Sequence, residues 1–148
     1  MCCYIGAKIV GGKNSEVQNM AEFGRNLGLA FQLQDDLLDI TGDQQKFGKL
    51  VGGDLIEGKK TYLFLKALEK AKGEDKKLLK AVIDKKGIRK SQVDKYRRLY
   101  EKLGVFEDAK KEIRKYSENA LKCVQKVSDS QSRDILTWLT HKLVNRIN

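Results

Sequence analysis

Four aspartates lie in one short segment, FQLQDDLLDITGD at residues 31–43, which is otherwise rich in Leu, Ile, Phe and Gln. Asp35, Asp36 and Asp39 fall at helical spacing, where neighbouring carboxylates repel one another and lose hydration at a cost. A bound cation would remove both penalties, and ligands made only of carboxylate oxygen favour Mg²⁺ or Mn²⁺ over zinc. We therefore predict a metal site at these aspartates. The alternative is an acidic last turn on a solvated helix.

Lysines follow the aspartates in a glycine-rich stretch. Lys49 lies in FGKLVGGD, and Lys59 with Lys60 lies in EGKKT. A Mg²⁺ ion that is held by one or two carboxylates commonly shares phosphate oxygens, whose remaining charge lysines can neutralise. The pattern therefore predicts a substrate that carries phosphate. The lysine spacing does not match a nucleotide P-loop.

The direction of the aspartates follows from helix geometry. At ~100° per residue, Asp35 and Asp39 share one stripe with earlier small and apolar residues, which are Val17, Ala21, Gly24, Gly28 and Phe31. We expect this stripe to face neighbouring elements. Gly24 and Gly28 would let another helix approach closely.

The sequence predicts helices around these residues. The chain has 148 residues and no proline, which favours long helices and an all-α single domain. A capping box at Ser15 and Gln18 predicts the start of a long helix over about 15–41. A glycine-rich loop over about 42–58 follows, in which several glycines are free to take positive φ. Further helices are expected over about 59–72, 75–86, 91–103, 105–128 and 131–147, and the end of an earlier helix over 2–11.

Composition excludes several classes of protein. No window approaches the roughly 18 apolar residues of a membrane span, so we expect a cytoplasmic protein without a transmembrane segment. Cys2, Cys3 and Cys123 have no metal-binding spacing and are expected to be reduced. The net charge of +10 combines −2 in residues 1–48 with +12 in residues 49–148. Its lysines alternate with acids and lack interleaved aromatics, so we expect no nucleic-acid partner.

The motif region closely resembles the second aspartate-rich region of the trans-isoprenyl diphosphate synthases, or polyprenyl synthetases. The segments LGLAFQLQDDLLDITGD and GKLVGGDLIEGKKTYLFLKALE match the pattern G-x-x-F-Q-x-x-D-D-x-x-D, then G-K, a later Asp and G-K-x-T. The matching residues are Gly28, Phe31, Gln32, Asp35, Asp36, Asp39, Gly48, Lys49, Asp54, Gly58, Lys59 and Thr61. The resemblance covers the C-terminal half of the usual family length. It implies a helical bundle with part of the isoprenoid-synthase (terpenoid synthase) fold.

The resemblance also implies a reaction, in which Mg²⁺ helps to ionise an allylic diphosphate and the carbocation alkylates isopentenyl diphosphate. By position, Asp35 would bind a shared Mg²⁺, and Asp36 and Asp39 would support it directly or through water. Gln32, Lys49 and Lys59 would contact the allylic diphosphate, so Asp35 and Lys49 are the predicted catalytic residues. Asp54 and Thr61 would have supporting or structural roles. The family implies a homodimer, and because the first aspartate-rich motif is absent, we expect this chain alone to be inactive.

Other functions remain open at this stage. A terpene cyclase shares the fold, but it would carry an Asn/Asp–Ser/Thr–Glu pattern in place of D-D-x-x-D. A non-catalytic helical dimerisation or regulatory domain derived from the same fold would retain the helices without turnover. A basic nucleic-acid module would show steeply salt-dependent binding.

Overall fold

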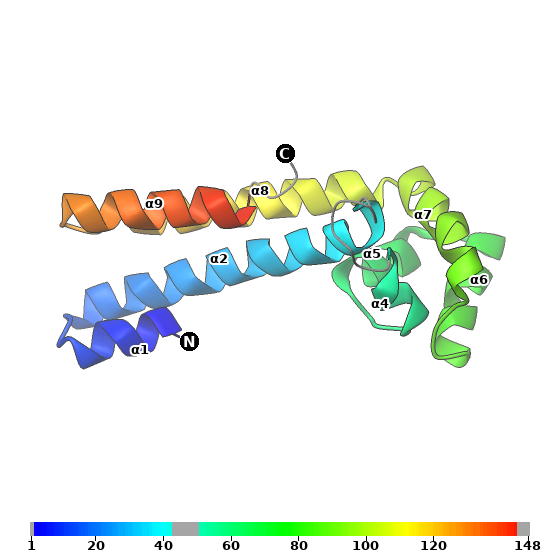
Figure 1. Ribbon diagram of the computed structural model, residues 1–148, viewed down its shortest axis with the longest axis horizontal. Helices are drawn as coiled ribbons and strands as arrows, with labels where there is room; N and C mark the ends of the chain where they lie inside the picture. The colour runs from blue at the N-terminus through cyan, green and yellow to red at the C-terminus, as the bar shows by residue number, and fades with distance from the viewer. Residues whose placement is uncertain (1, 43–50, 145–148) are drawn as a thin grey trace. The chain divides into compact units, whose positions relative to one another are not determined.

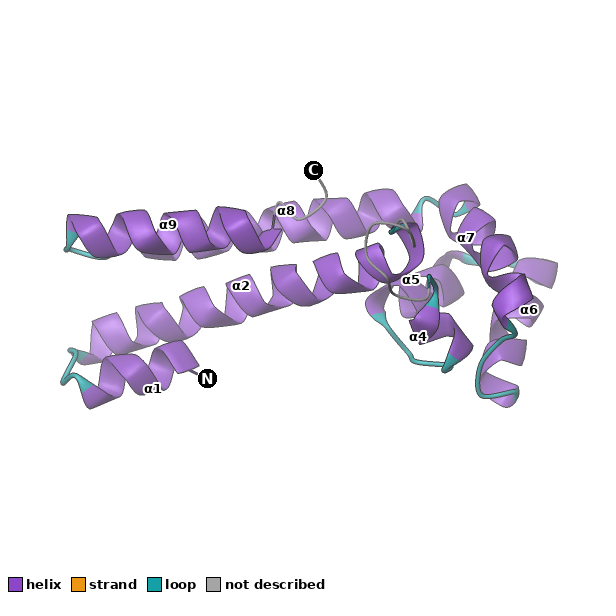
Figure 2. Ribbon diagram, viewed as in Figure 1, coloured by secondary structure: helices purple, strands orange, loops and turns teal. Residues whose placement is uncertain are grey.

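The computed structural model describes residues 2–42 and 51–144, and Figure 1 shows their helices in chain order. Every regular element among these residues is helical, as Figure 2 shows by colour, which confirms the prediction of an all-α fold. None of the helices in this part of the chain is long and apolar enough to cross a membrane. The chain divides into two compact units, Met1–Gln34 with Lys111–Asn148, and Asp35–Lys110.

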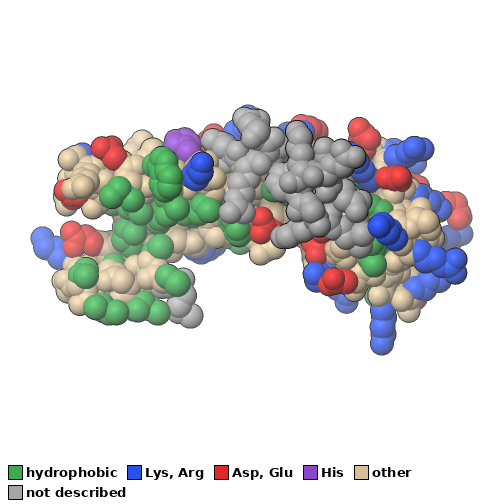
Figure 3. Space-filling model, viewed as in Figure 1, with side chains coloured by type: hydrophobic (Ala, Val, Ile, Leu, Met, Phe, Trp, Pro, Cys, Tyr) green, Lys and Arg blue, Asp and Glu red, His purple; other side chains and the backbone are tan. Residues whose placement is uncertain are grey.

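The first unit is a helical bundle around an apolar cluster. It contains α1 (Cys2–Ile9), most of α2 (Asn14–Thr41), the later part of α8 (Val105–Val124) and α9 (Ser130–Val144). The buried members of the cluster are Phe23, Leu27, Ala120, Cys123 and Val124, and side chains of α1 and α9 pack against them. Figure 3 shows hydrophobic side chains gathered over this part of the molecule. Apolar burial of this kind is the main stabilising contribution to a helical bundle.

The second unit surrounds the C-terminal turns of α2 with shorter helices. They are α4 (Gly53–Ile56), α5 (Tyr62–Lys70), α6 (Gly73–Asp84), the 3₁₀-helix η1 (Lys90–Gln92), α7 (Val93–Lys102) and the start of α8. The buried residues of this core include Leu37, Leu55, Leu63, Phe64, Leu79, Val82, Tyr96, Leu99, Tyr100 and Val105. The unit therefore has an apolar core of its own, against which the end of α2 is held.

The start of α2 differs from the predicted Ser15–Gln18 box. The helix begins at Asn14, one residue earlier than predicted. Glu16 therefore takes the third helical position, and its carboxylate accepts a hydrogen bond of 2.8 Å from the Lys13 N–H. An acidic side chain at this position commonly reaches back to the residue before the helix.

The glycine-rich stretch is only partly a loop. It contains the short helix α4, and residues 43–50 lie outside the described residues. Gly52 and Gly58 have φ of 74° and 69°, as predicted for glycines in this stretch. A Cβ atom on Gly52 would lie 2.5 Å from Cγ1 of Val93, so only glycine lets α4 begin against α7.

The next two helix boundaries also depend on local backbone geometry. Helix α5 begins at Tyr62 rather than near Lys59, because the Thr61 hydroxyl accepts the N–H of Phe64 at the start of the helix. Ala71 and Lys72 have extended backbones, which end α5 and precede α6. Helix α6 therefore begins at Gly73, slightly before the predicted start near residue 75.

Candidate functional site

Asp36, a residue of α2, contacts the first residue of α5. Its side chain is buried, with 8% of the residue exposed, and Oδ2 accepts a hydrogen bond of 3.3 Å from the N–H of Tyr62. A carboxylate is favourable at a helix N-terminus because it satisfies N–H groups that lack a partner within the helix. Together with the Thr61 hydroxyl, Asp36 fixes the beginning of α5 against the end of α2.

Asp39 holds the segment that leads into α4. Its backbone oxygen accepts the N–H of Gly52 at 2.7 Å, and its Oδ2 accepts the N–H of Asp54 at 3.1 Å. Burial raises the pKa of the Asp39 carboxyl above its usual value, while the hydrogen bond from the Asp54 N–H opposes that rise. The carboxylate is therefore partly desolvated at the end of α2.

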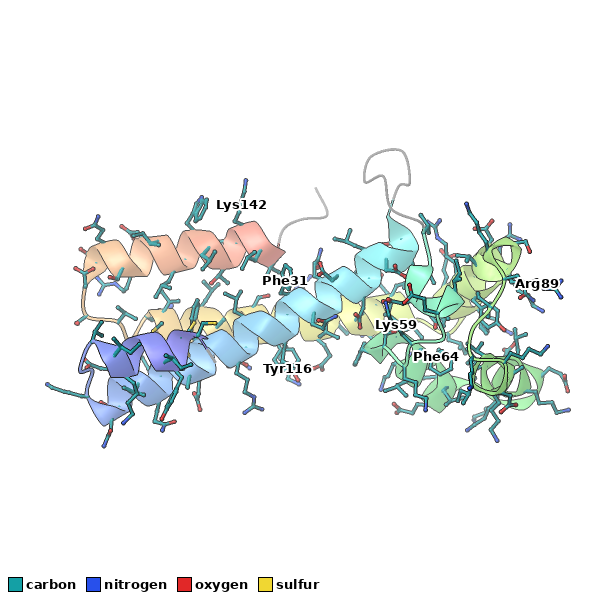
Figure 4. All side chains as sticks on the ribbon, turned by 60° about the horizontal axis from the view of Figure 1, so that its bottom comes forward. Phe31, Lys59, Phe64, Arg89, Tyr116 and Lys142 are labelled. Atoms are coloured by element: carbon teal, nitrogen blue, oxygen red, sulfur yellow. The ribbon has the colours of Figure 1, made fainter. Side chains whose placement is uncertain are left out.

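Lys59 lies close to the carboxylates of Asp39 and Asp54, and Figure 4 labels its side chain. Its Nζ forms ion pairs with Asp54 Oδ1 at 3.0 Å and with Glu57 Oε2 at 2.8 Å. Hydrogen bonds to Glu57 and Asp54 raise the pKa of the Lys59 ammonium, which keeps it charged. The positive charge of Lys59 also acts on Asp39, where it lowers the pKa of the carboxyl. The structure thus brings together Asp39, Asp54 and Lys59.

Three other predicted site residues are Asp35, Gln32 and Lys49, of which the structure describes the first two. Asp35 is half-buried and precedes Asp36 on α2, and Gln32 is exposed, three residues before Asp35. Lys49 falls within residues 43–50 and so lies outside the described residues.

The predicted inward direction of the Asp35 stripe is wrong for most of α2. Apart from Val17, the buried residues of α2 lie on other sides of the helix, and they are Phe23, Leu27, Ala30, Leu33, Gln34, Asp36, Leu37 and Ile40. Large apolar side chains decide which face is buried, whereas the predicted stripe rested on small residues. Close approach occurs at Gly24, where a Cβ would lie 3.0 Å from Cys3 Sγ, but a Cβ on Gly28 would meet nothing within 4 Å.

The donor atoms at the end of α2 fit a magnesium ion in their chemistry. Asp35, Asp36 and Asp39 provide only hard carboxylate oxygens, and Asp39 is half-buried. Within residues 2–42 and 51–144, no three His, Cys, Asp or Glu side chains are grouped closely enough to hold an ion. The described residues therefore offer donors of the right chemical type, but they do not form an assembled site of three protein ligands.

The sequence interpretation missed two features of the site. Glu57 pairs with Lys59, and its position two residues earlier in IEGKK was the available signal. The backbone N–H groups of Gly52, Asp54 and Tyr62 bind Asp39 and Asp36, and no residue type could have indicated these contacts.

Comparisons with known proteins agree with the motif. The model of the polyprenyl synthetase family matches residues 1–103. A geranylgeranyl diphosphate synthase of Sulfolobus acidocaldarius is 37% identical over 124 residues, which are 84% of this chain and 37% of that protein. The chain belongs to the polyprenyl synthetase family.

Solved structures of polyprenyl synthetases share the fold. A decaprenyl diphosphate synthase from Rhodobacter capsulatus has a TM-score of 0.86 at 30% identity, over 98% of this chain and 45% of that one. A geranylgeranyl pyrophosphate synthase from Corynebacterium glutamicum, complexed with isoprenyl diphosphate and magnesium, has a TM-score of 0.84 at 29% identity, over 95% and 40%. The predicted isoprenoid-synthase fold is confirmed. The chain spans less than half the length of these relatives.

Proposed function

We propose that this polyprenyl synthetase chain functions in a prenyltransferase, which condenses an allylic diphosphate with isopentenyl diphosphate. The observation that carries the proposal is the end of α2, where the D-D-x-x-D carboxylates meet the segment that bears Lys59. Family membership and the names of the relatives support the same activity. The magnesium in the Corynebacterium glutamicum complex supports Mg²⁺ as the cofactor.

The three aspartates would have different roles toward the ion. Asp36 and Asp39 both accept hydrogen bonds from backbone N–H groups, of Tyr62 and of Asp54 respectively. We assign Asp35 as the leading ligand, with Asp36 and Asp39 supporting the ion directly or through water. When bound, Mg²⁺ would stabilise the negative charge of the departing diphosphate.

Cationic and polar side chains would bind the substrate beside the carboxylates. In this proposal Gln32, Lys49 and Lys59 contact the allylic diphosphate, and the ammonium groups donate charge-assisted hydrogen bonds to its oxygens. The sequence contains one D-D-x-x-D motif, whereas the proposed reaction uses two metal-binding clusters. We therefore infer that the chain alone does not turn over. We also propose a homodimer, because the family resemblance implies one.

A chimaeric enzyme tests the activity. The chain would replace the matching part of the Sulfolobus acidocaldarius relative, and incorporation of labelled isopentenyl diphosphate would be measured with Mg²⁺. We expect the chimaera to turn over and Asp35→Ala to reduce its rate on the order of 10³-fold, because a metal ligand is lost. Turnover by the unfused chain, or an Asp35→Ala rate within about tenfold of the parent chimaera, would contradict the proposal.

A further inference from the structure

The segment from Gly52 to Lys59 is joined to the end of α2 through Asp39. The Gly52 N–H donates to the Asp39 backbone oxygen, and the Asp54 N–H donates to Asp39 Oδ2. Because the second bond uses the backbone of Asp54, the Asp54 carboxylate remains available for another group. Asp54 is therefore anchored without using its own side chain.

That carboxylate binds Lys59. Asp54 Oδ1 accepts from Lys59 Nζ at 3.0 Å, and the Asp54 backbone oxygen accepts the Lys59 N–H at 2.8 Å. The Asp54 side chain is 25% exposed, whereas the Lys59 side chain is 55% exposed. Asp54, which is less exposed and binds Lys59 through both its side chain and its backbone, thus restrains the Lys59 side chain.

Glu57 provides a natural comparison within the same cluster. It pairs with Lys59 at 2.8 Å, slightly closer than Asp54, but its side chain is 63% exposed. Within the described part of the chain, Glu57 has no hydrogen bond or ion pair to α2. Glu57 therefore adds charge beside Lys59 without fixing the ammonium relative to Asp39.

The restraint matters because a lysine ammonium sits on a flexible four-carbon stem. A ligand that must first immobilise such a side chain binds less tightly than one that meets it already in place. The ammonium has three N–H donors, of which the two carboxylates use two, so one can reach a phosphate oxygen.

We propose that Asp54 is a positioning residue for diphosphate binding, which holds the Lys59 ammonium beside Asp39 before the ligand arrives. The inference rests on the proposed function for the identity of the ligand. The arrangement of Asp39, Asp54 and Lys59 does not depend on that function.

The first test needs no ligand. Lysine side chains of the 148-residue chain would be labelled with ¹⁵N, and the order parameter of the Lys59 NH₃⁺ group would be measured by NMR. Asp54→Asn and Glu57→Gln each neutralise one carboxylate that pairs with the Lys59 ammonium, so they are matched variants. We expect Asp54→Asn to lower the order parameter clearly and Glu57→Gln to leave it close to the parent value. Equal values in the two variants would overturn the inference.

The second test is a double-mutant cycle on affinity for inorganic diphosphate with Mg²⁺, followed by calorimetry. We expect Asp54→Asn to bind about tenfold more weakly than Glu57→Gln, since the charge change is the same and only the positioning differs. In a Lys59→Ala background, Asp54→Asn should cause no further loss, because Asp54 acts through Lys59. A further loss in that background would show a structural role for Asp54 and would overturn the inference.

The two tests separate this inference from the proposed function. If Asp54→Asn frees the ammonium but the unaltered chain does not bind diphosphate with Mg²⁺, the proposed function fails and the Asp54–Lys59 arrangement stands. If the unaltered chain binds diphosphate and the Lys59 order parameter is the same in all variants, the proposed function stands and the positioning role fails.

Discussion

Helix α2 makes two kinds of contact along its length. In the first unit, Phe23 and Leu27 lie in an apolar cluster with Cys123 and its neighbours. In the second unit, Asp36 and Asp39 accept backbone N–H groups from the chain that follows. The apolar contacts depend on volume and burial, whereas the carboxylate contacts depend on charge and on precise geometry. The second region should therefore respond to pH and to ions, and the first should not.

The largest expected effect on stability lies in the apolar region. Phe23→Ala should lower the free energy of unfolding by about 3–5 kcal/mol, because it leaves a cavity beside Leu27 and Cys123. Urea denaturation followed by circular dichroism measures this. Leu29→Ala, at a residue with 37% exposure, is the control and should have a much smaller effect. Equal losses for the two variants would show that the cluster does not stabilise the first unit.

A smaller effect is expected at the start of α5. Asp36→Ala removes the acceptor for the Tyr62 N–H, and we expect a loss of about 1–3 kcal/mol in the free energy of unfolding. Asp36→Asn keeps an oxygen acceptor of similar size and should lose less. Chemical denaturation of both variants without divalent cations makes the comparison. A loss as large in Asp36→Asn as in Asp36→Ala would mean that charge, and not the hydrogen bond, is what Asp36 contributes.

The smallest effect is a pH dependence from Asp39. Burial raises the pKa of this carboxyl in the folded chain above its ordinary value of 3.8, so the folded state binds more protons than the unfolded state just above pH 3.8. The contribution of Asp39 to stability is thus fully present below pH 3.8 and is lost as pH rises through the folded pKa. We expect the parent to lose stability relative to Asp39→Asn as the pH rises from about 4 to 6. The free energy of unfolding of the parent minus that of the variant should therefore fall.

Denaturation of both chains across this range, without divalent cations, measures the difference. A difference that grew with pH would mean that the hydrogen bond from Asp54 and the charge of Lys59 outweigh the burial of Asp39.

The helical class and the family could be predicted from the sequence, because helix propensity and the D-D-x-x-D spacing are local signals. The direction of Asp35 could not, because a stripe of Gly and Ala looks like a packing face on a wheel even where larger residues pack elsewhere. The start of α5 needed the contact between Asp36 and Tyr62, whose positions are separated by the glycine-rich stretch. Such tertiary contacts choose among boundaries that the local pattern allows.

The role of Lys59 illustrates the same limit in the site itself. Its place after a glycine indicated a cation near the aspartates, and the structure puts it beside Asp39. The pairing with Asp54 and Glu57 depends on the turn after α4, which includes Gly58 at positive φ. A residue pattern can indicate charge in a region, but the folded backbone decides which carboxylates hold it.

Binding of Mg²⁺ with diphosphate at the end of α2 would change the unfolding midpoint of the 148-residue chain, which thermal or chemical denaturation measures. Mg²⁺ should raise the midpoint, and Mg²⁺ with diphosphate should raise it further. A ligand concentration of 100 times its dissociation constant adds roughly 2.7 kcal/mol to the free energy of unfolding. Asp35→Asn keeps the size of the side chain and should remove most of this gain. Diphosphate alone is the control, because a chain of net charge +10 can bind any polyanion. A full shift with diphosphate alone, unchanged in Asp35→Asn, would contradict the metal site.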